Sequence, residues 1–238
     1  MKDTMSFGVI GAMESEVARL RGLMSGVTSS KIAGLTFYDG TMGAHRVVLV
    51  QSGIGKVNAA RCTQILIDRF APDCIVNTGI AGGIGKGLAV ADVVIGTELV
   101  QHDFDISVFG HARGYLATGK DHLNPTVFRS DAALVEAFRR SAEAVVGAER
   151  VKTGRIASGD QFISERAVKR DIAETFGAAA AEMEGCAIAQ VAEYAGVPFV
   201  VVRAISDLAD ESAADSSVDL EQMAADLSGS ILEKLIAG

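Results

Sequence analysis

The chain has 238 residues, 49% of them hydrophobic, and carries a formal net charge of -8 at pH 7. Its acidic residues are scattered and no basic cluster is present, which argues against nucleic acid or an acidic membrane surface as a partner. The three cysteines form no C-x-x-C pair, which argues against a disulfide framework or a structural zinc site. Because the N-terminus turns polar at Glu14 and no apolar run reaches about 18 residues, we expect a cytoplasmic protein without export signal or membrane anchor.

Strand-like apolar runs alternate with segments of helical spacing along the chain. The predicted strands are 7–12, 45–53, 73–79, 91–100, 151–159 and 199–206. Several are apolar on both faces, as expected for strands covered by helices on two sides. The predicted helices are the segment with Val17, Leu20 and Leu23–Met24 on one face, then 59–70, 132–146, 186–195 and 220–238. We predict one three-layer α/β domain spanning 1–238, with 101–130 as a long functional or interface loop.

The glycine-rich run NTGIAGGIGKG, residues 77–87, follows a predicted strand, where backbone amides can bind an anion. A Walker loop would need Gly and Ser or Thr at the places held by Ile80 and Gly87. Taken alone, these glycines are best interpreted as turn formers. They still mark the C-terminal end of an internal strand, where open α/β sheets bind their ligands.

Three acidic residues near predicted strand ends are candidates for chemistry. Glu14 and Glu16 fall in the first turn of a helix, where the helix dipole also favours a purely structural acid. Asp207 ends the apolar strand VPFVVVRAIS. A buried carboxyl group there would have a raised pKa and could donate a proton near neutrality.

A second acidic pair, Glu182 and Glu184, interrupts the small and apolar stretch AAAAEMEGCAIAQVA, residues 178–192. Buried carboxylates are costly unless something pairs with them or uses them, so this stretch indicates chemistry. The segment GDQFIS, 159–164, combines a turn with a Phe-Ile pair, for which core packing is the alternative interpretation. The histidines have no metal-ligand spacing and indicate no metal site: His45, His102, His111 and His122.

Taken together, six segments resemble the bacterial 5'-methylthioadenosine/S-adenosylhomocysteine nucleosidases in order and spacing. They are GAMESEV (11–17), SGIGKVNAA (52–60), NTGIAGG (77–83), SGDQFI (158–163), AEMEGCAIA (181–189) and VVVRAISDLAD (200–210). The most specific parts are G-A-M-E-x-E-V, E-M-E and R-A-I-S-D, and the resemblance covers essentially the whole chain. It implies a nucleoside phosphorylase-like fold with a central mixed sheet flanked by helices. It also implies hydrolysis of the N-glycosidic bond of an adenine thioribonucleoside, without metal or organic cofactor.

The resemblance implies roles for individual residues. Asp207 would protonate adenine at N7, and Glu16 would orient and deprotonate water on the opposite face of the sugar. Glu184 would bind the ribose hydroxyls and stabilise an oxocarbenium-like transition state, while Met183 packs on the sugar. Glu182 is expected close to the ribose.

The remaining substrate contacts also follow from the resemblance. Phe162 would stack on adenine, and Ile163 would contact it through main-chain groups. Other pocket residues implied by the matching motifs are Ile54, Ile80, Ala81, Gly82, Arg203 and Ser206. Bacterial-type phosphorylases, which resemble this chain, end the strand at 77–80 with a phosphate-binding Arg and Ser. Here Asn77 and Ile80 stand in those places, so water is the expected nucleophile.

The chain departs from the nucleosidase pattern at three places. Ile80 replaces a usual Ser. Phe109 matches an aromatic residue that the family lends across a homodimer interface to the neighbouring alkylthio pocket, but His111 replaces a Tyr beside it. In 211–220 the usual pocket Phe is missing, and Val218 is nearest. Two alternatives therefore stay open: hydrolysis of a related nucleoside, such as adenosine, 5'-deoxyadenosine or futalosine, and nucleoside binding without catalysis.

Overall fold

The computed structural model of the chain describes residues 4–117, 121–210 and 218–237. Within these residues, ten strands form one sheet. The strands are β1 (Ser6–Gly11), β2 (Ser25–Ile32), β3 (Leu35–Met42), β4 (His45–Gln51), β5 (Cys74–Gly83), β6 (Val93–Gln101), β7 (Phe128–Arg129), β8 (Val151–Ser158), β9 (Ala178–Glu182) and β10 (Phe199–Asp207). The helices are α1 (Glu14–Leu23), α2 (Lys56–Phe70), α3 (Ala132–Val146), α4 (Arg166–Phe176), α5 (Gly185–Tyr194) and α6 (Val218–Ala237), with short 3-10 turns η1 (Ser107–Phe109) and η2 (Ala148–Arg150).

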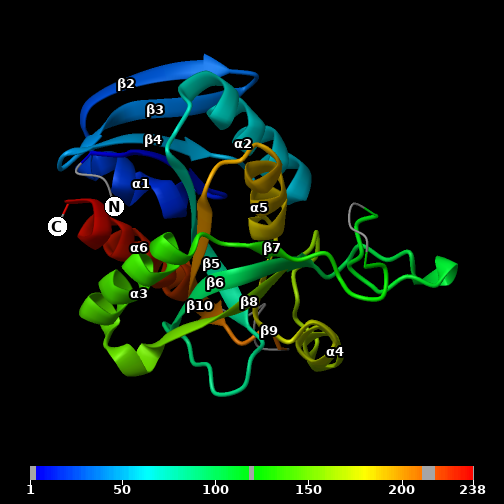
Figure 1. Cartoon of the computed structure of the whole chain (residues 1–238). Helices are drawn as coiled ribbons and strands as arrows, with labels where there is room; N and C mark the ends of the chain where they lie inside the picture. The colour runs from blue at the N-terminus through cyan, green and yellow to red at the C-terminus, as the bar shows by residue number, and fades with distance from the viewer. Residues whose placement is uncertain (1–3, 118–120, 211–217, 238) are drawn as a thin grey trace.

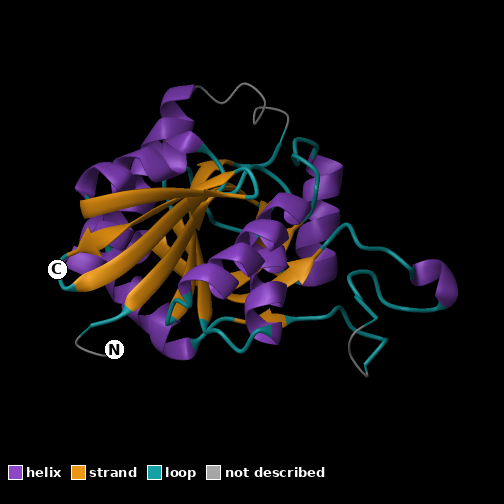
Figure 2. Ribbon diagram, turned by 90° about the horizontal axis from the view of Figure 1, so that it is seen from above, coloured by secondary structure: helices purple, strands orange, loops and turns teal. Residues whose placement is uncertain are grey.

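Helices cover the sheet on both sides (Figures 1 and 2). Helices α2 and α5 pack together on one face, whereas α1, α3 and α6 pack on the other. Helix α4 covers β8 and β9. The predicted α/β class, with a central mixed sheet flanked by helices, is therefore confirmed. Among the described residues, no helix is both long and apolar enough to cross a membrane.

Burial on both faces explains the continuous apolar runs. In β6, Val93 and Ile95 belong to the core beneath α3 and α6, whereas Val94 belongs to the core beneath α2 and α5. Successive side chains of a strand point to opposite faces, so a strand covered on both sides needs an apolar residue at every position. The six predicted strands accordingly correspond to β1, β4, β5, β6, β8 and β10.

The sheet is mixed, and half of it closes on itself. β1 runs parallel to β4 and β5, and β5 runs parallel to β10. β6 runs antiparallel to β10 and parallel to β8, and β9 joins β8 to β5. The strands β5, β10, β6, β8 and β9 thus form a closed ring of pairings. This closure brings the ends of β5, β9 and β10 to one place.

The predicted alternation of strand and helix throughout the chain is wrong at the N-terminal end. After α1, the strands β2, β3 and β4 follow one another as an antiparallel meander with no helix between them. Strand β2, SGVTSSKI, is exposed along almost its whole length. It lies at the edge of the sheet and needs no apolar pattern, so the sequence carries no signal for it.

Three further differences concern β9, α4 and β5. Strand β9 and helix α4 are not predicted from the sequence; four of the five residues of β9 are alanines, which carry little strand preference. The interpretation of the glycines in 77–87 as turn formers holds for Gly87, which lies in a turn with a positive φ, but it is wrong for three others. Gly79, Gly82 and Gly83 lie inside β5, which continues to Gly83.

Between β6 and α3 the chain leaves the body as a long excursion, visible at the right of Figure 1. We call residues 103–117 and 121–127 the arm; the described part of it has only the η1 turn as regular structure. On the arm, Val108, Phe109 and Leu123 expose 86%, 74% and 69% of their surface. Such exposure of large apolar side chains on a protruding segment is typical of an interaction surface.

Candidate active site

The register of the closed ring assembles a site from distant parts of the sequence. Asp207 at the end of β10 pairs with Gly82 of β5, and Gly82 pairs with Ala181 of β9. Glu182, the next residue of β9, pairs with Ser158 at the end of β8. Strand β1, which leads into α1 with Glu16, lies on the other side of β5.

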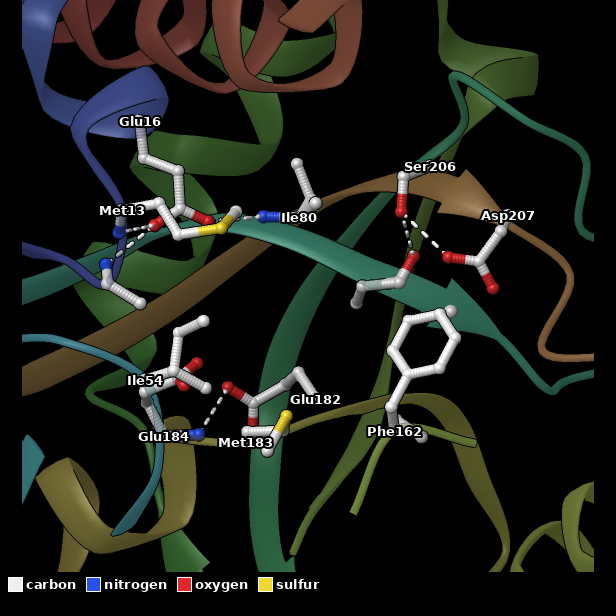
Figure 3. A pocket seen from close by; sticks show the side chains of 14 residues that line it. Met13, Glu16, Ile54, Ile80, Phe162, Glu182, Met183, Glu184, Ser206 and Asp207 are labelled. Carbon is white, nitrogen blue, oxygen red and sulfur yellow. Dashed lines mark hydrogen bonds between the residues drawn. The ribbon is translucent and has the colours of Figure 1, made fainter. Parts of the chain in front are cut away.

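These strand ends surround a cavity of about 250 Å³ (Figure 3). Its lining is mostly apolar, with acidic groups at opposite sides, as expected for a small-molecule site. The lining residues are Ala12, Met13, Glu16, Ile54, Ile80, Ala81, Gly82, Phe162, Ala181, Glu182, Met183, Glu184, Ser206 and Asp207. Ile54 and Phe162 are 51% and 61% exposed, so the cavity is open on their side.

Glu16 is buried and held in place by backbone N–H groups. Its Oε2 accepts hydrogen bonds from Ala12 N at 2.5 Å and Met13 N at 3.0 Å, and its Oε1 accepts one from Ile80 N at 3.1 Å. A Cβ atom on Gly79 would lie 2.4 Å from Glu16 Oε1 and 2.3 Å from Arg203 Nη1. Glycine is therefore required there because two charged side chains pass against the backbone of β5.

Arg203 is wholly buried in β10 and does not line the cavity. Its Nη2 donates to Glu182 Oε2 and Asn77 Oδ1 and lies 3.6 Å from Glu184 Oε2. Burial alone would lower the pKa of Arg203, but the carboxylates of Glu182, Glu184 and Glu16 outweigh it and raise that pKa. The guanidinium therefore remains charged, and it compensates the acids around it.

Glu182 accepts hydrogen bonds from four protein groups. One oxygen accepts from Ser158 Oγ, and the other accepts from Arg203 and from the N–H groups of Glu184 and Gly185. A carboxylate used in this way orders its surroundings, in this case Arg203 and the start of α5. The prediction placed Glu182 close to the ribose; the structure places it in the cavity wall, with its oxygens turned to these partners.

Glu184 has fewer partners than Glu182. Its Oε1 accepts a hydrogen bond from Gly55 N at 2.9 Å. Burial and the neighbouring negative charge of Glu182 raise the pKa of Glu184 to about 7. This carboxyl group can therefore exchange a proton near neutral pH, and it faces the cavity with hydrogen-bonding capacity to spare.

Asp207 lies across the cavity from Glu16 (Figure 3). Its Oδ2 accepts from Ser206 Oγ at 2.8 Å and its Oδ1 accepts from Ala209 N at 2.7 Å. The Ser206 hydroxyl also lies 3.5 Å from the carbonyl oxygen of Ala81. The two acids are thus held on opposite sides of one cavity by unrelated parts of the chain.

Two predicted base-contacting residues lie beside Asp207. A smaller cavity of about 40 Å³ adjoins the first and is lined by Phe162 and Ile163 together with Asp207. Two predicted site residues line neither cavity: Phe109 lies on the arm, and Arg203 is buried with its guanidinium on Glu182 and Asn77. Within the arm, the His111 ring is tilted against Tyr115 and meets His122 edge to face, at centroid distances of 5.1 and 5.6 Å. The side chain of Val218 lies outside the described residues.

Sequence reasoning missed several wall residues. Ala12, Met13 and Ala181 line the cavity although none was predicted to. Met13 is part of the motif GAMESEV, so the motif could have indicated it. Ala12 belongs to the same motif and Ala181 to AEMEGCAIA, although an alanine by itself carries no chemical signal. The described residues contain no group of three or more His, Cys, Asp or Glu side chains that could hold a metal ion.

The fold and the site define the class of protein. The family model of the phosphorylase superfamily matches residues 6–237, so the chain belongs to that superfamily. Within it, the chain belongs to the 5'-methylthioadenosine/S-adenosylhomocysteine nucleosidases. The nucleosidase of Anoxybacillus flavithermus is 43% identical over 222 residues, which cover 92% of this chain and 90% of the relative.

Solved structures agree with this assignment. The chain superposes on the nucleosidase of Neisseria meningitidis in complex with methylthio-immucillin-A with a TM-score of 0.91 and 42% identity, covering 98% of this chain and 99% of the other. It also superposes on a mutant futalosine hydrolase of Helicobacter pylori with a TM-score of 0.90 and 30% identity, covering 98% of each chain.

Proposed function

We propose that this protein hydrolyses the N-glycosidic bond of 5'-methylthioadenosine and S-adenosylhomocysteine, releasing adenine and the thioribose product. The observation that carries the proposal is the placement of Glu16 and Asp207 on opposite sides of one largely apolar cavity. Family membership and the inhibitor bound to the Neisseria meningitidis relative support the substrate class.

Asp207 is the proposed general acid. Cleavage of the bond from C1' to N9 leaves adenine as the leaving group, and protonation at N7 makes its departure easier. When Asp207 carries the proton, the Ser206 hydroxyl can turn to the carbonyl oxygen of Ala81 and accept from the acid. Phe162 and Ile163, which line the smaller cavity beside Asp207, would hold the adenine ring.

Glu16 is the proposed general base for water on the opposite face of the sugar. Three backbone N–H groups fix its carboxylate, so its direction is set before substrate arrives. Glu184 would bind the ribose hydroxyls and stabilise positive charge on the sugar in the transition state, while Met183 packs against it. Glu182 and Arg203 would act behind them by holding Glu184 and the start of α5 in place.

Water is the proposed nucleophile rather than phosphate. None of the described residues that line the cavity is Lys, Arg or His. Asn77 is buried, with its amide oxygen on Arg203 and its amide nitrogen donating to the Ile10 carbonyl oxygen. The guanidinium of Arg203 is itself surrounded by carboxylates. An incoming phosphate would therefore meet negative charge instead of anion ligands.

A homodimer completes the proposal. The exposed Phe109 on the arm would reach the alkylthio end of a neighbouring protomer's cavity, which is open beside Ile54 and Phe162. Burying an aromatic side chain against an alkylthio group removes apolar surface from water on both. The three cysteines are free and buried, which supports the expectation of a reducing, cytoplasmic environment.

The direct test is incubation of the purified protein with 5'-methylthioadenosine, with and without phosphate. We expect free adenine and the free reducing sugar in equal amounts at the same rate in both buffers. Formation of a sugar 1-phosphate would overturn the hydrolase assignment, and absence of adenine release would favour a nucleoside-binding protein without catalysis.

The related Helicobacter pylori structure makes futalosine the second candidate substrate. The choice depends on the 5' end of the nucleoside, which Phe109 and His111 on the arm of a neighbouring protomer would meet. Steady-state comparison of methylthioadenosine, adenosylhomocysteine, futalosine, 5'-deoxyadenosine and adenosine would rank them. A kcat/KM for futalosine above that for both thionucleosides would replace the proposed substrates.

A further inference from the structure

Beside the cavity, but outside its lining, three chain segments meet at one charged side chain. Lys56 is the first residue of α2, and its Nζ lies 2.5 Å from Asp103 Oδ1, 3.1 Å from Gln101 Oε1 and 3.9 Å from Asp160 Oδ2. Asp103 stands at the root of the arm, and Asp160 stands in the loop after β8. We call Lys56, Asp103 and Asp160 the charge triangle.

Two backbone N–H groups add further hydrogen bonds between the three segments. Lys56 N donates to Asp160 Oδ1 at 2.8 Å, and Asp160 N donates to Asp103 Oδ2 at 2.8 Å. Each of the three segments is thus joined to both others by hydrogen bonds that involve a charged group. Such bonds are shorter and stronger than neutral ones.

The lysine and one of its partners are largely withdrawn from solvent. The side chains of Lys56 and Asp103 are 16% and 17% exposed, whereas that of Asp160 is 49% exposed. Burial alone would raise the pKa of Asp103, but the bonds from Lys56 and Asp160 N outweigh it and lower that pKa. A pair shielded in this way holds its geometry better than an exposed one, which solvent and salt weaken.

Each corner of the triangle leads directly to part of the active site. Gly55, next to Lys56, donates its N–H to Glu184, and Ile54 lines the cavity. Phe162, two residues after Asp160, lines it as well. The third corner, Asp103, is where the arm that carries Phe109 leaves the body. Neither Glu16 nor Asp207 belongs to any of these three segments.

We propose that Lys56 is a positioning residue, which sets the ribose-side turn at 53–56, the base-side loop at 158–163 and the root of the arm relative to one another. The inference rests on the proposed function, because it assigns Lys56 to the same substrate site. Lys56 does not line the cavity; it acts through the neighbouring segments that carry Ile54 and Phe162. It therefore governs how well the nucleoside is held, and the acid and base on the opposite elements keep their geometry without it.

The test compares Lys56→Met with Lys31→Met, which removes the same charge from the exposed edge strand β2. We expect Lys56→Met to raise KM for methylthioadenosine by roughly tenfold, the loss expected for one charge-assisted hydrogen bond, with kcat within about threefold. Lys31→Met should match the wild type. Asp103→Asn should raise KM by a similar factor. In the double variant, which carries both Lys56→Met and Asp103→Asn, KM should rise by less than the product of the two single factors, because both substitutions break the same ion pair.

Amide hydrogen exchange supplies a second readout that needs no turnover. In Lys56→Met, exchange should become faster in 53–58, 101–105 and 158–163 and stay unchanged in β1 and β10. This measurement tests the triangle even if the wild type releases no adenine, which would count against the proposed function alone. The inference is overturned by unchanged exchange in the three segments, by KM within about twofold of the wild type, or by faster exchange over the whole chain. If Lys56→Met does not fold, the same outcomes are read from Asp103→Asn.

Discussion

At the scale of single residues, the two acids of the GAMESEV motif have opposite environments. Glu14 is exposed and pairs with Arg21 at 2.7 Å, whereas Glu16 is buried and faces the cavity. The sequence places both in the first turn of a helix, and only the resemblance distinguished them. The structure supplies the physical difference: two residues apart in α1, the side chains point to nearly opposite sides of the helix, and only that of Glu16 is buried.

This pair offers a matched comparison. Glu16→Gln should lower kcat by roughly 10²- to 10⁴-fold, because the attacking water loses its base. Glu14→Gln removes the same charge two residues away and should keep near wild-type turnover. Initial rates of adenine release on both variants check this. Normal turnover of Glu16→Gln combined with loss in Glu14→Gln would mean that the wrong acid is assigned.

The proposed acid is tested in the same way. Asp207→Asn should retain the fold and nucleoside binding but lose roughly 10²- to 10⁴-fold in kcat, because an amide cannot protonate adenine N7. Isothermal titration with methylthioadenosine measures the binding, and adenine release measures the rate. Turnover within about threefold of the wild type would remove Asp207 from the mechanism.

Glu184 predicts a dependence of stability on pH. Its pKa is about 7 in the folded protein against an ordinary 4.5, so between these values the folded state binds more protons than the unfolded state. The contribution of Glu184 to the free energy of unfolding is therefore fully present below about pH 4.5 and is lost as the pH rises through about 7. Glutamine does not titrate, so Glu184→Gln does not lose this stability. The difference between its unfolding temperature and that of the wild type should therefore grow as the pH is raised from 5 to 8.

The control for this experiment is Glu193→Gln, at an exposed position of the same helix α5. Its unfolding temperature should follow that of the wild type across the same pH range. Thermal unfolding followed by circular dichroism measures all three proteins. A constant difference between Glu184→Gln and the wild type from pH 5 to pH 8 would contradict the assignment.

At the scale of elements, β5 serves the site because its glycines have no side chains. Its glycines let Glu16 and Arg203 approach the backbone at Gly79, and Gly82 pairs with Asp207. Behind Gly79, Ser228 of α6 hydrogen-bonds to Thr78 Oγ1 and accepts from Gly79 N at 3.2 Å. The strand is thereby held between the C-terminal helix and the two charged side chains.

Gly79→Ala should therefore abolish most turnover. The added Cβ would lie 2.3 Å from Arg203 Nη1 and 2.4 Å from Glu16 Oε1, so at least one of these groups must move. A misplacement of about 1 Å at a reacting group can cost 10²-fold in rate. Gly22→Ala in α1 meets nothing within 4 Å and should leave turnover unchanged. Full activity of Gly79→Ala would show that the two side chains can be displaced without harm.

At the scale of the whole molecule, the arm and the open side of the cavity both expose apolar side chains. Large apolar side chains are exposed on the arm, and the cavity is exposed beside Ile54 and Phe162. In the proposed homodimer, a second copy of the chain would cover both and have its own arm covered in return, because a two-fold interface uses the same surfaces twice.

Phe109→Ala tests this arrangement. It should raise KM for methylthioadenosine more than KM for adenosine, because only the former loses apolar contact at its 5' end. Adenosine serves as the control substrate on the same variant, and analytical ultracentrifugation gives the oligomeric state. Equal losses for both nucleosides would place Phe109 away from the 5' pocket, and a fully active monomer would exclude the dimer as the working form.

Much of the architecture could be predicted from the sequence because burial leaves a local trace. Strands covered on both sides must be apolar at every position, as Val93, Val94 and Ile95 are, and helices on a sheet must carry an apolar stripe. Strand β2 is exposed and β9 is built mostly of alanine, so neither leaves such a trace. The meander and the closed ring of strands therefore could not be predicted.

The sequence by itself determined the α/β class, the identity of the acids and the motifs that relate the chain to its family, because these depend on residue type and order. Only the tertiary structure decided which groups meet. It turned Glu182 to Ser158 and Arg203, left Glu184 facing the cavity, and joined Lys56 to Asp103 and Asp160. Hydrogen bonds and charge interactions act over a few ångströms in space, whereas these partners lie tens of residues apart in the chain. Strand register and closure of the sheet, which no local pattern encodes, bring them together.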